Sequence, residues 1–203
     1  MKIRFHILHT ILAFLTITLL LSTSCQNSEP HKPIITVSIQ PQKHLLEKIV
    51  GDKFNVICLL SNGSNPETYE PSMTHLMNLE KSKAYFCIGN IGFEMAIVDK
   101  AKKNNPDLKI FKNNENIKLI HGSHAGLASS HLGHNHHSHE IDPHIWTSAV
   151  NAKIIAQNMC NALCDIDPKN KSYFQNNLNT LINEINVLHN ELSAQLKSAE
   201  GEA

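Results

Sequence analysis

The alternation of short apolar runs with helical patterns between residues 34 and 111 narrows the fold more than any other feature. The runs are short and rich in β-branched or aromatic residues, as strands are. The segments between them carry apolar residues at helical spacing, and we expect Met73, Leu76, Met77 and Leu79 to face the core. The expected strands are 34–39, 54–60, 84–89 and 108–111, and the expected helices are 41–50, 71–79 and 93–103. This order predicts an α/β fold in which a mostly parallel sheet is flanked by helices.

The chain becomes fully helical after residue 147. Residues 148–164 place Val150, Ile154 and Leu163 on one stripe, and Asp167-Pro168 is typical of the start of a helix. From there apolar residues recur at spacings of three and four, which predicts a helix of about 30 residues and about 45 Å. A coiled coil is the alternative, but the apolar positions lack a regular heptad. We interpret the helix as a strut leading out of the first lobe.

The first 25 residues have the pattern of an export signal. Lys2 and Arg4 precede a nearly unbroken apolar run at 11–21, and small residues lead to Cys25. This ending resembles a bacterial lipobox, in which Cys25 would carry the lipid, although Ser22 stands where Leu is preferred. An ordinary signal peptide and an uncleaved anchor are the alternatives. We therefore expect an exported, membrane-anchored lipoprotein with a signal at 1–25 and a tether at 26–33.

Composition weighs against nucleic acid as a partner. The formal net charge is zero and aromatic residues make up 5% of the chain, so neither a basic surface nor stacking platforms are predicted. The cysteines that would remain after export are Cys58, Cys87, Cys160 and Cys164. Their spacing includes no CxxC, and cysteine-based zinc ligation is therefore not predicted.

Half of the 14 histidines lie between His121 and His139, among Gly, Ser and Asn. Neutral imidazole is a good ligand for zinc, and the segment has too few apolar residues to form a core. An engineered tag and an incidental spacer are the alternatives. We interpret 121–139 as a low-affinity loop that captures metal, and its densest part is His134, His136, His137 and His139.

Several motifs in fixed order carry a family resemblance. They are NPETYEPSM at 65–73, AYFCIGNIGFE at 84–94, the histidine-rich insert, DPHIW at 142–146 and NAKIIAQNM at 151–159. This order resembles the TroA- or ZnuA-like periplasmic metal-binding components of zinc and manganese ABC importers. The resemblance implies two α/β lobes joined by one long helix, with the metal between the lobes. It implies an N-terminal metal-binding lobe at 34–147 and a helical segment at 148–198 that includes the linker helix.

The resemblance also implies the metal ligands. The family pattern after the second strand is Pro-His-x-x-Glu-Pro, and here Glu67 stands in place of that histidine. A carboxylate can occupy the same coordination position as a harder ligand, or it can change the metal preference. The second ligand carries over unchanged as His144. The family's other two ligands come from a second lobe that has no counterpart in this sequence, so we expect a truncated member with half a site.

Together these features predict a receptor, not an enzyme. We expect it to capture zinc outside the membrane and deliver it to an ABC-type permease. A receptor for manganese or iron, which Glu67 favours, and a periplasmic zinc buffer are the alternatives. A metallohydrolase is disfavoured because the sequence has neither HExxH nor GxSxG.

Overall fold

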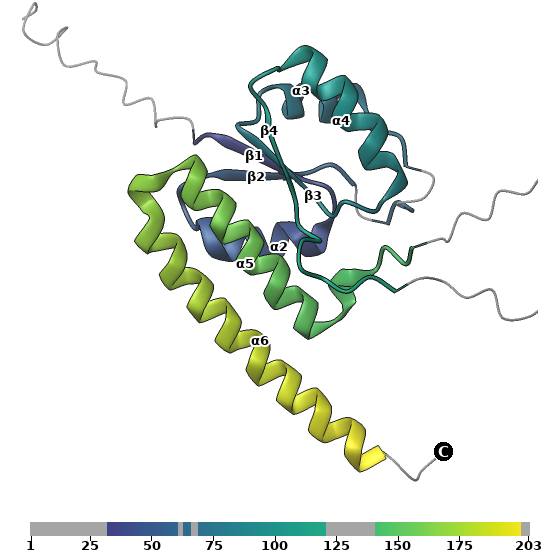
Figure 1. Cartoon of the computed structure of the whole chain (residues 1–203), viewed down its shortest axis with the longest axis vertical. Helices are drawn as coiled ribbons and strands as arrows, with labels where there is room; N and C mark the ends of the chain where they lie inside the picture. The colour runs from purple at the N-terminus through teal and green to yellow at the C-terminus, as the bar shows by residue number, and fades with distance from the viewer. Residues whose placement is uncertain (1–31, 61–62, 66–68, 121–140, 200–203) are drawn as a thin grey trace, which may run out of the picture. The chain divides into compact units, whose positions relative to one another are not determined.

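Four parallel strands form the centre of the described chain (Figure 1). The computed structural model describes residues 32–60, 63–65, 69–120 and 141–199, within one compact unit, Lys32–Ala203. The sheet order is β2-β1-β3-β4. The strands are β1 Ile34–Val37, β2 Asn55–Cys58, β3 Ala84–Cys87 and β4 Lys109–Lys112. The predicted α/β fold with a parallel sheet is thereby confirmed, whereas the signal predicted at 1–25 lies outside the described residues.

The two inner strands, β1 and β3, explain the unbroken apolar runs of the sequence. All four residues of β3 are buried, as are Ile35 and Val37 of β1. The pairing is in parallel register, with Ile35 opposite Ala84 and Val37 opposite Phe86. A strand covered on both faces needs apolar side chains at successive positions, so the alternating pattern of a half-exposed strand is absent here.

Helices cover both faces of this sheet (Figure 1). Three helices pack against one another on one face and two on the other. The first group comprises α2 Gln40–Val50, α5 Ala149–Ile166 and α6 Lys171–Ala199. The second comprises α3 Met73–Glu80 and α4 Gly92–Asn104. Two short 3-10 turns, η1 Ile145–Thr147 and η2 Pro168–Asn170, precede α5 and α6. In the part of the chain that the structure describes, none of these helices has the length and apolarity to cross a membrane.

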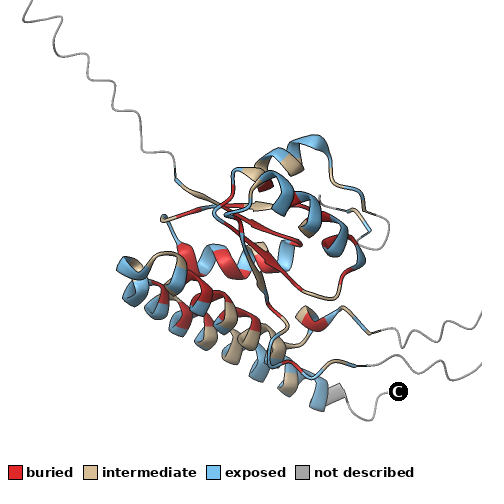
Figure 2. Ribbon diagram, turned by 45° about the horizontal axis from the view of Figure 1, so that its top comes forward, coloured by how far each residue is buried: buried red, intermediate tan, exposed pale blue. Residues whose placement is uncertain are grey.

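The long C-terminal helix α6 differs between its two halves. It has 29 residues, which confirms the predicted length. Phe174, Leu178 and Leu181 in the first half are buried against α2 and α5, whereas Leu192 and Leu196 in the second half are exposed (Figure 2). The apolar spacing continues along the helix, but the neighbouring helices cover only its beginning.

Three side chains predicted to face the core do not. Met73 and Met77 of α3 are 73% and 50% exposed, and Val150 of α5 is also exposed. Helix α3 has only eight residues and reaches the core through Leu79, which is fully buried. These three predictions were wrong because the apolar face of a helix can be wider than the surface that packs on the core, especially in a short helix or a terminal turn.

The two halves of α6 provide a matched test of core packing. Leu178→Ala removes a side chain that is 3% exposed and should lower the free energy of unfolding by about 2–5 kcal/mol. Leu192→Ala truncates a side chain that is 48% exposed and should change it by about 1 kcal/mol or less. Urea unfolding of both variants measures the difference. Equal losses would show that the second half of α6 is covered in solution.

Candidate metal centre

The turn formed by Asp142, Pro143 and His144 presents an imidazole to solvent. The Asp142 carboxylate Oδ1 accepts the His144 backbone N–H at 2.9 Å and lies 2.8 Å from the ring Nδ1. The His144 side chain is 52% exposed. Because the ring donates its Nδ1–H to the carboxylate, the Nε2 lone pair remains available to a ligand. Metal-binding histidines are commonly oriented by such a carboxylate.

Neighbouring residues fix the position of this turn. The His144 backbone carbonyl accepts hydrogen bonds from the hydroxyl and the N–H of Thr147, at 2.8 and 3.2 Å. Ile145 is buried in the core, and the Trp146 ring lies 5.1 Å from the His144 ring, centroid to centroid. The backbone N–H of His144 and then its ring hold the pKa of the Asp142 carboxyl below its ordinary value. The carboxylate is therefore ionised at neutral pH and keeps the imidazole oriented.

The same turn closes the histidine-rich insert. The Asp142 backbone N–H donates to the Ile120 carbonyl at 2.9 Å, so residues 120 and 142 are held together where the insert leaves and rejoins the lobe. The predicted capture residues His134, His136, His137 and His139 lie outside the described residues. Ile120 and Asp142, the described residues on either side of the insert, are joined at the turn that carries His144.

A second anchor holds the chain that follows the loop after β2. The Tyr69 hydroxyl donates to the Leu59 carbonyl and lies 2.5 Å from His75 Nδ1. The Tyr69 ring packs edge-on against Phe93 of α4, with 5.2 Å between centroids. Burial raises the pKa of Tyr69, which keeps the hydroxyl protonated as a donor. Ser72 then caps α3 by accepting the His75 N–H at 3.3 Å.

The other predicted ligand, Glu67, lies outside the described residues, as does the predicted lipidation site Cys25. Within the described ranges, no three His, Cys, Asp or Glu side chains are grouped in a way that could hold a metal ion. The site that the structure describes therefore consists of one oriented imidazole, His144, with its supporting carboxylate.

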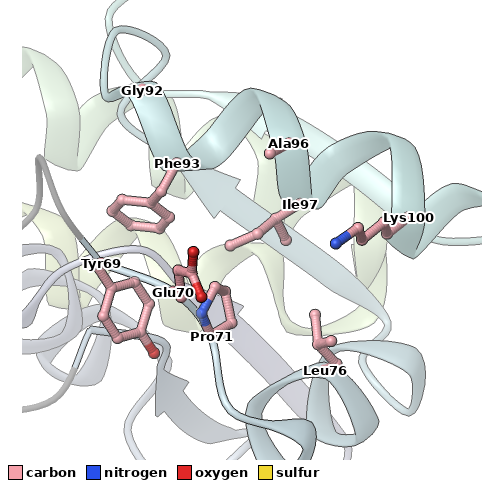
Figure 3. A pocket seen from close by; sticks show the side chains of 9 residues that line it. All are labelled: Tyr69, Glu70, Pro71, Leu76, Gly92, Phe93, Ala96, Ile97 and Lys100. Atoms are coloured by element: carbon pink, nitrogen blue, oxygen red, sulfur yellow. The ribbon is translucent and has the colours of Figure 1, made fainter.

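A pocket beside Tyr69 is a different feature. It has a volume of about 510 Å³ and lies between the Tyr69–Pro71 segment and α4 (Figure 3). Phe93 and Ile97 form one side, and Glu70 and Lys100 are the charged residues among its described lining, which includes no imidazole. A lining with one carboxylate and one ammonium group is a poor donor set for a divalent cation, so we do not assign this pocket to the metal.

Three of the four described cysteines are poorly suited to bind metal. Cys58, Cys87, Cys160 and Cys164 are free thiols. Burial raises the pKa of Cys58 to about 11 and those of Cys87 and Cys160 to about 12. A thiol binds metal as the thiolate, which is scarce at neutral pH when the pKa is this high.

Two supporting residues were not identified from the sequence. The sequence presents Asp142 only as part of the DPHIW motif, although an Asp two residues before a His, across a proline, is a recognisable pattern for a carboxylate that orients the ring. The anchoring role of Tyr69 could not be found from the sequence, because its partners Leu59 and Phe93 are 10 and 24 positions away.

A parallel α/β lobe that continues into a long helix and exposes a carboxylate-oriented imidazole has the architecture of a metal-binding lobe. Comparison with known proteins agrees. The family model "Zinc-uptake complex component A periplasmic" matches residues 35–203. The chain therefore belongs to this family of metal-binding transport receptors, which are not enzymes.

Three similar proteins illustrate the family. The zinc-binding lipoprotein AdcA of Streptococcus pneumoniae is 26% identical over 94% of this chain and 38% of its own length. The manganese ABC transporter substrate-binding lipoprotein scaA of Streptococcus gordonii is 28% identical over 72% and 46%. A crystal structure of a zinc-bound ZnuA deletion mutant is 32% identical, with a TM-score of 0.70 over 82% of this chain and 59% of that chain. The chain spans about half the length or less of the two curated relatives, and somewhat more than half of the crystallised chain.

The contact between His144 and Asp142 predicts the tautomer of the ring. We expect the neutral His144 imidazole to carry its proton on Nδ1, because Asp142 Oδ1 accepts from that atom. Long-range ¹H–¹⁵N correlation spectra at neutral pH measure the populations of the two imidazole tautomers. Asp142→Ala should lower the Nδ1–H population, whereas Asp107→Ala, at an exposed turn, should leave it unchanged. An equal response to both variants would contradict the assignment.

Proposed function

We propose that the chain is the lobe of an extracytoplasmic receptor that captures Zn²⁺ and delivers it to an ABC-type permease. The observation that carries this proposal is the oriented and exposed imidazole of His144. An ion held between two lobes must be reached from outside, so a ligand residue needs exposure as well as a fixed direction. His144 has both, through Asp142 and the turn that enters η1.

Glu67 is proposed as the second ligand from this lobe. It occupies the position of the family's histidine in the loop that follows β2. In parallel sheets, loops beyond the carboxyl ends of the strands are the usual place for ligands, and this loop is one of them. Tyr69, two residues further on, ties the returning chain to the Leu59 carbonyl at the end of β2. This anchor fixes Tyr69, the first described residue after the loop and two positions beyond Glu67.

The histidine-rich insert is proposed as a capture loop that supplies the main site. The bridge between Ile120 and Asp142 attaches it directly to the turn that carries His144. Because a residue spans at most about 3.6 Å, His139 lies within about 18 Å of His144 and His134 within about 36 Å. Imidazoles tethered at this range raise the local concentration of metal at the main site.

Zinc is our choice of ion. The loop supplies seven histidines in addition to His144, and ligands rich in nitrogen suit zinc better than manganese. Glu67 is the observation that favours the alternative, since manganese prefers oxygen ligands, and scaA is named as a manganese protein. A periplasmic zinc buffer without a permease is a further alternative, in which deletion of the gene would not impair growth in low zinc.

The permease partner and the lipid anchor complete the proposal. Family membership supports work with an ABC transporter, and AdcA and scaA are both named lipoproteins. Cys25, at the end of the signal-like segment, is the residue to which we assign the lipid. The permease would then receive metal from a receptor held at the same membrane, which shortens the search between the two proteins.

Metal titration tests the role of His144. Isothermal titration with Zn²⁺ should give a tighter phase that His144→Ala weakens at least about tenfold, because a direct ligand is lost. His189→Ala removes another exposed histidine, on α6, and should leave this phase unchanged. Competition titrations with Mn²⁺ compare the affinities for the two ions, and tighter binding of Mn²⁺ would contradict the zinc assignment. If His144→Ala leaves the affinity of the tighter phase unchanged, the assignment of His144 as a metal ligand is contradicted.

The capture loop predicts a separate outcome. Replacing His134, His136, His137 and His139 with Asn should reduce the number of weakly bound Zn²⁺ ions and change the tighter phase by less than about twofold. Replacing Ser123, Ser129, Ser130 and Ser138 with Ala alters the same loop without removing ligands and serves as the control. In the wild type the weak phase should disappear below about pH 6, where imidazoles become protonated. An unchanged number of weak ions in the histidine variant would exclude the capture role.

A further inference from the structure

A buried carboxylate lies at the junction of β1, β3 and α4. Glu94 is 2% exposed. Its carboxylate accepts the backbone N–H groups of Ile88 and Gly89, each at 2.7 Å, and of Ile91 at 3.4 Å. It also accepts a hydrogen bond from the Ser38 hydroxyl. A carboxylate in the interior is tolerated only when donors replace water, and here four donors do so.

These contacts exceed what the N-terminus of a helix requires. The Ile91 N–H bond alone belongs to the first turn of α4. The bond from Ser38 connects α4 to the end of β1, and the Ser38 hydroxyl also lies 2.7 Å from the Tyr85 hydroxyl of β3. Gln42 of α2 accepts the Ser38 N–H at 3.1 Å and donates to the Phe86 carbonyl at 3.2 Å. One polar network therefore joins both inner strands and two helices.

The network fills a place where a ligand is usually expected. In open parallel sheets, ligands bind beyond the carboxyl ends of the strands, where helices leave for opposite faces. After β1 the chain enters α2 on one face, and after β3 it enters α4 on the other (Figure 1). Glu94, Ser38 and Gln42 are buried at that point, so a ligand must bind further out, in the loops.

A short path connects Glu94 to those loops. Phe93, the preceding residue in α4, packs edge-on against Tyr69. Tyr69 in turn bonds to Leu59 and His75 and anchors the chain that returns from the loop after β2. A change at Glu94 that shifts the first helical turn of α4 would therefore move the Phe93 ring and weaken its packing against Tyr69.

We infer that Glu94 is a positioning residue for metal binding, because its carboxylate fixes the first turn of α4 and, through Phe93, the Tyr69 anchor. The inference rests on the proposed function for its effect on metal affinity. Its effect on the Tyr69 segment can be measured independently of any metal.

Burial also makes Glu94 sensitive to pH. Burial raises the pKa of Glu94, while the bonds from Ser38, Gly89, Ile88 and Ile91 lower it, and the net direction is upward. Tyr85 and Cys87 of β3 are the titratable groups that its charge affects, and the pKa of each is raised, so both are neutral at neutral pH. An acid with a raised pKa in the folded state binds its proton more tightly there. The stabilisation it contributes is therefore present at low pH and lost as pH rises through the folded pKa.

Glu94→Gln tests the inference, with Asp99→Asn as the matched control. The glutamine side chain keeps the shape but presents an NH₂ group to backbone N–H donors, whereas Asp99 is an exposed acid on the same helix. We expect Glu94→Gln to weaken the tighter Zn²⁺ phase about tenfold, because the effect reaches the site through Phe93 and the Tyr69 anchor. Amide exchange at Ile88, Gly89, Ile91 and Tyr69 should also accelerate. Asp99→Asn should alter neither the Zn²⁺ affinity nor these exchange rates. The advantage of the wild type over Glu94→Gln in unfolding free energy should also shrink as pH rises above about 4.5.

Each other outcome has a defined meaning. If Glu94→Gln lowers stability but keeps the Zn²⁺ affinity within twofold of Asp99→Asn, Glu94 is purely structural and the inference fails. If Glu94→Gln does not fold, Ser38→Ala removes one donor, and the same two measurements decide. If the wild type binds no Zn²⁺, the proposed function fails, and the exchange at Tyr69 alone decides: acceleration specific to Glu94→Gln supports the positioning role, and its absence overturns it.

Discussion

The buried charge of Glu94 is the constraint on which the functional end of the lobe depends. A carboxylate inside a protein fixes its surroundings, because every donor that faces it must keep its place. Three of its donors are backbone groups of residues 88–91, so the path of the chain after β3 is determined by them. Gly89 fits this path with a φ of 106°, and a Cβ there would lie 2.8 Å from the Asn114 amide. Both conformation and space therefore disfavour replacement of this glycine.

The candidate site divides its tasks between exposed and buried groups. His144 lies at the surface, where a metal ion can reach it, and its orientation comes from Asp142 only two residues away. Glu94 lies in the interior and acts on the backbone. The first arrangement is local and requires little of the core, whereas the second connects strands and helices that are distant in sequence. Loss of the first would disturb one proposed ligand, and loss of the second would disturb the frame that carries several loops.

Similarity to relatives does not by itself identify the ion. AdcA, named for zinc, and scaA, named for manganese, are 26% and 28% identical to this chain. Donor chemistry is therefore the more informative guide. Imidazoles favour zinc and carboxylates favour manganese, and this chain combines His144 and a histidine-rich insert with Glu67, the proposed carboxylate ligand. Glu67 is the residue at which the two preferences conflict.

The sequence alone determined the order and the approximate bounds of the strands and helices, the 29-residue length of α6 to within about one residue, and His144 as a ligand candidate. It could do so because apolar periodicity, proline and glycine act over a few residues. Only the tertiary structure decided that Met73, Met77 and Leu192 are exposed, that Asp142 orients His144, and that Glu94 is buried among four donors. Periodicity shows which residues share a face of a helix, but whether anything covers that face depends on elements far away in the chain.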